Sequence, residues 1–194
     1  SMQGIDAALF ELVNAGPSVP AWSLPFASFA SDFLPALLAL ALAIGALLDR
    51  RWRHAFFTAM VSLLAVWLIV HVFRGLFPMP RPAFYGLGIQ WVPQGVRPGF
   101  PSMHAAGPFT AAFSLWCLPR RWPMLAALAV AATVAWSRLY LGLHFPSDVV
   151  AAAMLGALVS ILVERGLRLI PRIRISPAPV QAMMTRLRSR ARRA

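Results

Sequence analysis

The sequence predicts an all-α protein: a polytopic bundle of five transmembrane helices, with an amphipathic N-terminal helix lying in the membrane interface. Composition is the first indication, because 59% of the 194 residues are hydrophobic, 12% are charged and the mean hydropathy is +0.68. Such a chain is too apolar for an ordinary soluble domain. The second indication is a series of apolar runs near the ~20 residues that a helix needs to cross ~30 Å of hydrocarbon. The third is that arginines gather at the ends of these runs.

The first predicted helix, residues 5–14, is amphipathic. Five apolar residues share one helical face and two acidic residues lie off it: Ile5, Ala8, Leu9, Leu12 and Val13, against Asp6 and Glu11. Ten residues are too few to span a bilayer, so we expect this helix to lie in the interface, with a sixth short span as the alternative. The segment has no positively charged leader and no small-residue cleavage site, so we do not expect a removable signal peptide.

Five candidate spans follow, at about residues 24–48, 55–77, 102–118, 122–143 and 145–163. The last two candidate spans are separated by a helix break at Phe145-Pro146 and an N-cap at Ser147, which predicts a tight hairpin. We expect one domain over residues 1–175, of which 1–20 form the interfacial segment. A basic tail follows at 176–194, either as a short helix on anionic lipid or as solvated disorder.

The arginine-rich connections predict the orientation of the chain. They follow the first, third and fifth spans, and no basic residue precedes Arg50: Arg50, Arg51 and Arg53; Arg120 and Arg121; Arg165, Arg168, Arg172 and Arg174. The positive-inside rule places these connections and the C-terminus in the cytoplasm. The net charge of +12 therefore favours phospholipid headgroups over nucleic acid as the anionic partner. We expect a multi-pass protein of the bacterial inner membrane.

Three short fragments, all at predicted outer ends of spans, carry residues suited to chemistry. They are Arg74, six residues, Arg81-Pro82; Pro101-Ser102-Met103-His104; and Ser137-Arg138, five residues, His144, three residues, Asp148. A single juxtamembrane arginine usually reaches toward headgroups, and a serine before a helix is usually a cap. Arg138 is different because it lies inside an apolar run, where an unpaired charge costs roughly 2.5 to 3.5 kcal/mol. The fragments together predict a phosphate site facing the periplasm or the cell exterior.

The chemistry follows from the needs of phosphoryl transfer. Arginine forks and the amides at the helix start beside Ser102 suit the equatorial oxygens of a transferring phosphoryl group. His144 can attack phosphorus if Asp148, four residues on, fixes its tautomer, and His104 can protonate the leaving oxygen and then activate water. A phosphohistidine intermediate results. No metal and no cofactor is expected, because the site lacks the carboxylates that magnesium prefers, although His104, His144 and Asp148 could alternatively hold zinc.

The three fragments resemble the signature of the type 2 phosphatidic acid phosphatase (PAP2) superfamily. The resemblance implies that His144 is the nucleophile, His104 the acid and Asp148 the orienting carboxylate. It also implies four phosphate-binding residues: Arg74, Arg81, Ser102 and Arg138. Two positions depart from the usual pattern, since Arg74 replaces a lysine and Met103 replaces a glycine, which changes donor geometry and the shape of the site. Vanadium haloperoxidases share the motifs, but five spans argue against that soluble relative.

The small size and motif arrangement look most like bacterial undecaprenyl pyrophosphate phosphatases of the bacitracin-resistance type. That resemblance implies release of phosphate from the polyprenyl carrier and its recycling for peptidoglycan synthesis. Phosphatidylglycerophosphate or lipid A is the alternative substrate. A non-catalytic lipid-binding protein is a further alternative, which the intact His144, His104 and Asp148 disfavour. The expected partners are a lipid phosphate and membrane lipids, with no nucleic acid, and the oligomeric state is not predicted.

Overall fold

The protein is described by a computed structural model over residues 2–95 and 97–169, so the predicted basic tail lies outside the described residues. This part of the chain is all-helical, as predicted. Its elements in chain order are α1 (Met2–Val13), α2 (Ser23–Asp32), α3 (Leu34–Leu48), α4 (Arg50–Leu76), η1 (Pro82–Tyr85), α5 (Met103–Ser114), η2 (Leu115–Cys117), α6 (Trp122–Tyr140) and α7 (Pro146–Leu169).

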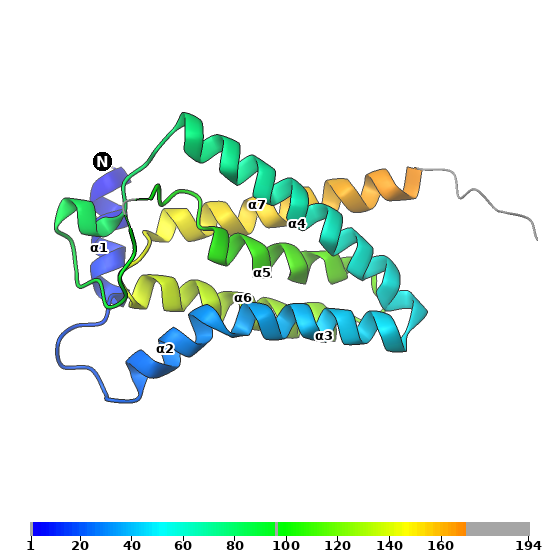
Figure 1. Ribbon diagram of the computed structural model, residues 1–194, viewed down its shortest axis with the longest axis horizontal. Helices are drawn as coiled ribbons and strands as arrows, with labels where there is room; N and C mark the ends of the chain where they lie inside the picture. The colour runs from blue at the N-terminus through cyan, green and yellow to red at the C-terminus, as the bar shows by residue number, and fades with distance from the viewer. Residues whose placement is uncertain (1, 96, 170–194) are drawn as a thin grey trace, which may run out of the picture.

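Helices α3 to α7 run along the long axis of the molecule, whereas α1 lies across one end (Figure 1). The short helix α5 occupies the centre, where it contacts α4, α6 and α7. Small side chains allow this close packing: Ala105, Ala106 and Ala112 are fully buried, and a Cβ at Gly156 of α7 would lie only 2.9 Å from the Thr110 backbone nitrogen. The site-bearing start of α5 is therefore fixed inside the bundle.

Within the described residues, three helices, α4, α6 and α7, are long and apolar enough to cross a membrane, and the pair α2 and α3 would make a fourth if counted as one bent span. The predicted five spans are therefore not confirmed, nor is a sixth. The difference lies in residues 102–118, where α5 has only 12 residues, about 18 Å, before the η2 turn. Pro119 follows, and the residue before a proline is disfavoured in the α conformation.

The predicted span 24–48 is also interrupted. Helices α2 and α3 meet at Phe33 with a bend of 44°. Pro35 lies in the first turn of α3, and a proline is tolerated there but not inside a continuous helix. The next helix starts earlier than expected, at Arg50, because the Asp49 side chain accepts a hydrogen bond from the Arg51 backbone nitrogen at 2.8 Å.

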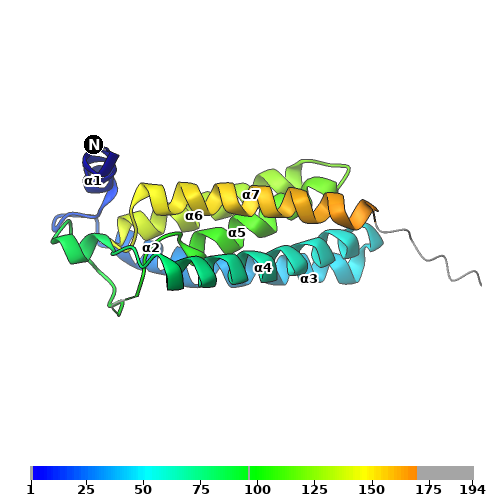
Figure 2. The same ribbon diagram turned by 90° about the horizontal axis from the view of Figure 1, so that it is seen from above.

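Helix α1 docks through a face that the sequence analysis did not identify. Its contacts come from Asp6 and Phe10, together with Asn14 directly after it, and Phe10 is fully buried with its ring 5.7 Å from that of Phe145. The expected apolar face is instead largely exposed, with Ile5, Leu9 and Leu12 at 65%, 47% and 82%. The position of α1 across the end of the bundle is clear in Figure 2. Its placement in a membrane interface remains a prediction.

The two ends of the bundle differ in chemistry. The junction of α3 and α4, the connection from α5 to α6 and the end of α7 lie together, and this end carries the arginine-rich segments (Figure 1). The end of α4, the start of α5 and the connection from α6 to α7 lie at the opposite end. The three sequence fragments that carry the predicted site residues therefore lie at one end of the molecule.

Candidate active site

The structure brings the seven predicted site residues to one end of the bundle from six places in the chain. Arg74 ends α4, Arg81 precedes η1, Ser102 and His104 start α5, Arg138 ends α6, His144 lies between α6 and α7, and Asp148 is in the first turn of α7. A hollow of about 330 Å³ is lined by four of them, Arg74, Arg81, His104 and His144. The other three are bonded next to it: Asp148 Oδ2 lies 2.9 Å from His144 Nδ1, Ser102 N donates to Asp148 O at 3.1 Å, and Arg138 O accepts from Leu143 N at 2.9 Å.

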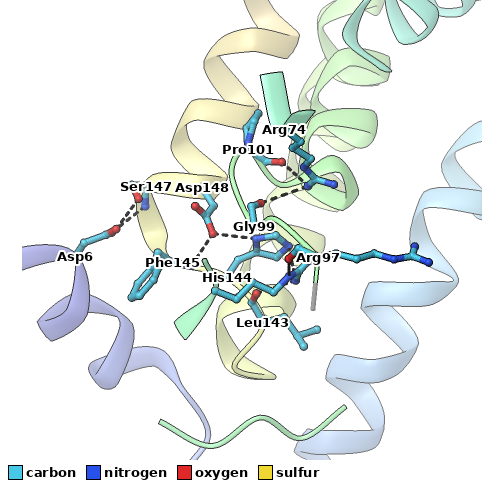
Figure 3. Close-up of polar contacts among 11 residues, drawn as sticks. Asp6, Arg74, Arg97, Gly99, Pro101, Leu143, His144, Phe145, Ser147 and Asp148 are labelled. Atoms are coloured by element: carbon cyan, nitrogen blue, oxygen red, sulfur yellow. Dashed lines mark hydrogen bonds and ion pairs between the residues drawn. The ribbon is translucent and has the colours of Figure 1, made fainter. Parts of the chain in front are cut away.

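The His144 imidazole is held between a carboxylate and a guanidinium. Its Nδ1 lies 2.9 Å from Asp148 Oδ2 (Figure 3). Its Nε2 lies 3.2 Å from Arg81 Nη1. A guanidinium can only donate, so Nε2 must accept, and the ring proton is then on Nδ1 and donated to Asp148. This is the tautomer that leaves a lone pair on Nε2, the nitrogen that contacts Arg81.

The surroundings of His144 favour its neutral form. The side chain is 1% exposed, and burial together with Arg81, Arg138, Arg74 and His104 lowers its pKa well below the usual range. A neutral imidazole with a free lone pair is the form required of a nucleophile or a general base.

Two hydrogen bonds fix the Asp148 carboxylate in turn. Asp148 Oδ2 accepts from the Phe145 backbone nitrogen at 3.0 Å as well as from His144. Both partners lie just before α7, four and three residues from Asp148, and Asp148 is in the first turn of α7, where the helix dipole favours a negative charge. Gly99 leaves room for this arrangement, because a Cβ there would lie 3.3 Å from Asp148 Oδ2 and 3.1 Å from Arg81 Cγ.

Arg81 connects the outer loop to the hairpin that carries His144. Its Nε donates to Arg97 O and its Nη1 to Leu143 O, both at 3.0 Å. Burial lowers the pKa of Arg81, and Arg74 acts in the same direction while Asp148 opposes it, but an arginine keeps its proton under these conditions. The guanidinium therefore supplies a fixed positive charge beside His144 Nε2.

Several donors in this region have no partner in the described part of the chain. Five buried side-chain nitrogen or oxygen atoms are unpaired there, and four of them belong to predicted phosphate-binding residues: Arg74 Nε, Ser102 Oγ, Arg138 Nε and Arg138 Nη2. A buried donor without a partner costs roughly 1 to 3 kcal/mol, and more when it is charged. Their concentration at one end of the bundle indicates a site for an anion with several acceptor oxygens.

Arg138 is the clearest case because only 2% of the residue is exposed. Its Nη1 donates to Ser31 Oγ of α2 at 2.6 Å, which fixes the guanidinium while leaving its other edge unpaired. Sequence reasoning missed Ser31. The available signal was the polar pair Ser31-Asp32 inside an otherwise apolar run.

Arg74 and Met103, the two unusual positions, both line the hollow. Arg74 Nη2 donates to Pro101 O at 2.6 Å and Gly99 O at 3.3 Å, so this arginine also holds the loop that leads into α5. Met103 packs against the buried cluster that includes Val66 and Ala105. Each of these two side chains therefore also contributes to the packing or hydrogen bonding of the fold.

The alternative of zinc at His104, His144 and Asp148 is not favoured by this geometry. Within residues 2–95 and 97–169, the metal-capable group whose ligand atoms lie within 4.8 Å of one another is His54, Cys117 and Glu164, at the opposite end. There the buried Glu164 accepts hydrogen bonds that join α4 to α7, from His54 at 2.7 Å and Thr58 at 3.1 Å, and a further one within α7, from Arg168 at 2.7 Å. This second polar cluster was not identified from the sequence.

Comparison with known proteins finds similarity to membrane phosphatases that act on lipids. The PAP2 superfamily matches residues 55–168. The chain is 32% identical over 161 residues to the "Putative undecaprenyl-diphosphatase YbjG" of Escherichia coli, covering 80% of this chain and 79% of that protein. It is 51% identical over 59 residues to the lipid A 4'-phosphatase of Bacteroides thetaiotaomicron, covering 30% of this chain and 26% of the relative. In fold it resembles the crystal structure of a transmembrane PAP2-type phosphatidylglycerolphosphate phosphatase from Bacillus subtilis, with a TM-score of 0.66, 22% identity and 89% of each chain covered.

Proposed function

Because the chain belongs to the PAP2 superfamily of membrane phosphatases, we propose that it hydrolyses undecaprenyl pyrophosphate to undecaprenyl phosphate and phosphate through a phosphohistidine intermediate. One observation carries the proposal. His144 lies between Asp148, at its Nδ1, and Arg81, at its Nε2, beside buried arginine and serine donors that lack partners in the described part of the chain. Such a site combines a nucleophile with a receptor for a phosphoryl group.

Binding of the terminal phosphate comes first. Arg138 offers an unpaired edge, Arg74 an unpaired Nε and Ser102 an unpaired hydroxyl, which together match the acceptor oxygens of a phosphate. Arg81 then exchanges its contact with His144 Nε2 for a phosphate oxygen, since the lone pair must be released before attack. With four positively charged or hydrogen-bonding residues supplying the stabilisation, the proposed mechanism needs no metal.

The first chemical step is attack of His144 Nε2 on the terminal phosphorus. The N–P bond forms as the bond from phosphorus to the bridging oxygen breaks, and protonated His104 gives its proton to the departing lipid phosphate. Asp148 stabilises the positive imidazole that develops. In the second step, water gives a proton to His104 and attacks phosphorus, and cleavage of the N–P bond releases inorganic phosphate and restores His144.

The choice of substrate rests on similarity along the chain. Of the two relatives compared by sequence above, the one that matches 161 residues is named a putative undecaprenyl-diphosphatase, whereas the lipid A phosphatase matches only 59 residues. We propose that the protein lies in the bacterial inner membrane and recycles the carrier for peptidoglycan synthesis, with the site facing outward as the arginine-rich connections predict. Lipid A or phosphatidylglycerophosphate is the second candidate, because the same site would accept either headgroup.

A panel of lipid substrates tests the proposal. Purified protein in detergent with EDTA is given undecaprenyl pyrophosphate, phosphatidylglycerophosphate or lipid A, and phosphate release is measured for the wild type and for His144→Ala. We expect the highest kcat/KM with undecaprenyl pyrophosphate and loss of release in the variant. Preference for another lipid would refute the substrate, a need for added metal would refute the metal-free mechanism, and full activity of His144→Ala would refute the nucleophile.

A further inference from the structure

A fourth arginine, Arg97, lies in the outer loop near the active site but belongs to none of the three sequence fragments. Its backbone oxygen accepts the hydrogen bond from Arg81 Nε at 3.0 Å, which ties its position to that of the site. Its side chain is exposed and extends away from His144 (Figure 3). Among the described residues it makes no salt bridge, so its charge is available to a ligand.

Arg97 lies where two hollows meet. The first is the hollow of about 330 Å³ that contains His144 and His104. The second, of about 540 Å³, is lined mainly by apolar side chains of the outer loop: Pro78, Met79, Pro80, Ala83, Phe84 and Pro98. Four residues line both, namely Arg81, Gln94, Gly95 and Arg97. The shared rim thus places two guanidinium groups and an amide between a cationic hollow and an apolar one.

We propose that Arg97 binds the second, lipid-attached phosphate of a diphosphate substrate and so distinguishes a lipid diphosphate from a lipid phosphomonoester. This inference rests on the proposed function. The terminal phosphate occupies the hollow at His144, and the second phosphate, one bridging oxygen away, reaches the shared rim. Beyond the rim, the apolar hollow accommodates the first carbons of the chain. A phosphomonoester places no phosphate at the rim.

The chemistry of the rim suits this role. Arginine binds phosphate through two parallel hydrogen bonds, and Gln94 adds an amide donor beside it. The second phosphate also becomes the leaving group, so negative charge accumulates on it as the bridging bond breaks. Arg97 therefore stabilises the transition state for a diphosphate, and not only its binding.

Two substrates that share one tail test the inference. Farnesyl diphosphate and farnesyl monophosphate are compared in detergent with EDTA, using the wild type, Arg97→Gln, Arg97→Lys and the control Arg120→Gln. Arg120 is exposed at the opposite end and lines neither hollow. We expect Arg97→Gln to lower kcat/KM for the diphosphate about 10- to 100-fold, as loss of charge-assisted hydrogen bonds predicts, and for the monophosphate less than about 3-fold. Arg97→Lys recovers part of the loss, and the control changes neither rate.

The outcomes separate this inference from the proposed function. If wild-type protein hydrolyses the diphosphate but Arg97→Gln slows both substrates equally, or neither, the assignment of Arg97 is wrong while the proposed function stands. Full recovery in Arg97→Lys would show that charge alone acts, which overturns the bidentate contact. If the wild type hydrolyses the monophosphate and not the diphosphate, the proposed function fails, and the inference fails with it.

Discussion

Replacing Asp148 by asparagine tests the orienting role of this carboxylate. The change keeps the size of the side chain and one acceptor oxygen, but it removes the negative charge beside His144. If the amide oxygen takes the place of Oδ2, the bonds from His144 Nδ1 at 2.9 Å and Phe145 N at 3.0 Å can persist. The variant therefore isolates the charge from the geometry.

The magnitude follows from the distance between the groups. When His144 attacks phosphorus, its ring becomes positive within hydrogen-bond distance of the carboxylate. Two unit charges about 4 Å apart interact by about 4 kcal/mol at an effective dielectric constant of about 20. Since about 1.4 kcal/mol corresponds to a tenfold change in rate, kcat should fall by about 10³-fold.

Phosphate release by wild type and Asp148→Asn, measured at saturating and limiting substrate, checks this value. We expect the loss in kcat with little change in KM, because Asp148 does not contact the substrate. Asp148→Ala serves as the comparison, and it should lose at least as much. An Asp148→Asn variant that keeps more than a tenth of the wild-type kcat would refute the reasoning.

Three further predictions concern other parts of the molecule. Arg138→Lys should lower kcat/KM about 10- to 100-fold, because a lysine ammonium group cannot bond Ser31 and two phosphate oxygens at once as the planar guanidinium can. Wild-type values in steady-state kinetics would contradict this. His144 should remain neutral as the pH falls to 6.5, since burial and the surrounding arginines lower its pKa. A ¹⁵N-histidine NMR titration in which His144 gains a proton at or above pH 6.5 would show that its pKa is not lowered. Glu164→Ala should lower the stability by about 1 to 3 kcal/mol, because it leaves three hydrogen-bond donors of α4 and α7 without their acceptor, while kcat stays unchanged. A thermal unfolding midpoint equal to that of the wild type, or a reduced kcat in folded protein, would contradict it.

Short-range spacing allowed the site to be predicted from the sequence. The separation of four residues between His144 and Asp148 corresponds to one helical turn, and the structure places the two side chains in hydrogen-bond contact. Arg138 was recognisable because a charge inside an apolar run requires an anion. The convergence of the fragments followed from counting spans, even though α5 proves shorter than the span predicted there. The roles assigned to these residues remain predictions.

Contacts between distant segments could not be predicted in the same way. The bond from Arg138 to Ser31 joins residues 107 apart, and the bond from the Ser147 backbone nitrogen to the Asp6 carboxylate joins residues 141 apart. No local periodicity encodes such pairings. Helix α1 illustrates the consequence, because the helix itself was predicted, whereas its docking face depends on Phe10 meeting Phe145 at the end of the bundle.

Breaks within the helices were a second feature that could not be predicted from the sequence. Hydropathy counts apolar residues and does not register where the backbone bends, so residues 24–48 were predicted as one span. Pro35 separates α2 from α3 there, and Pro119 helps to end the segment that begins with α5. Ser31, whose hydroxyl accepts the hydrogen bond from Arg138, lies two residues before this break.

The central claim is that His144 forms a covalent bond to phosphorus, and labelling of the enzyme tests it most directly. The His104→Ala variant is incubated with a ³²P-labelled aryl phosphate, whose leaving group needs no protonation, and the reaction is stopped in alkali, where phosphohistidine survives. Without His104 to activate water, the intermediate should accumulate on the peptide that contains His144, and His104→Ala/His144→Ala should carry no label. An unlabelled His104→Ala protein, or equal labelling of the double variant, would contradict the claim.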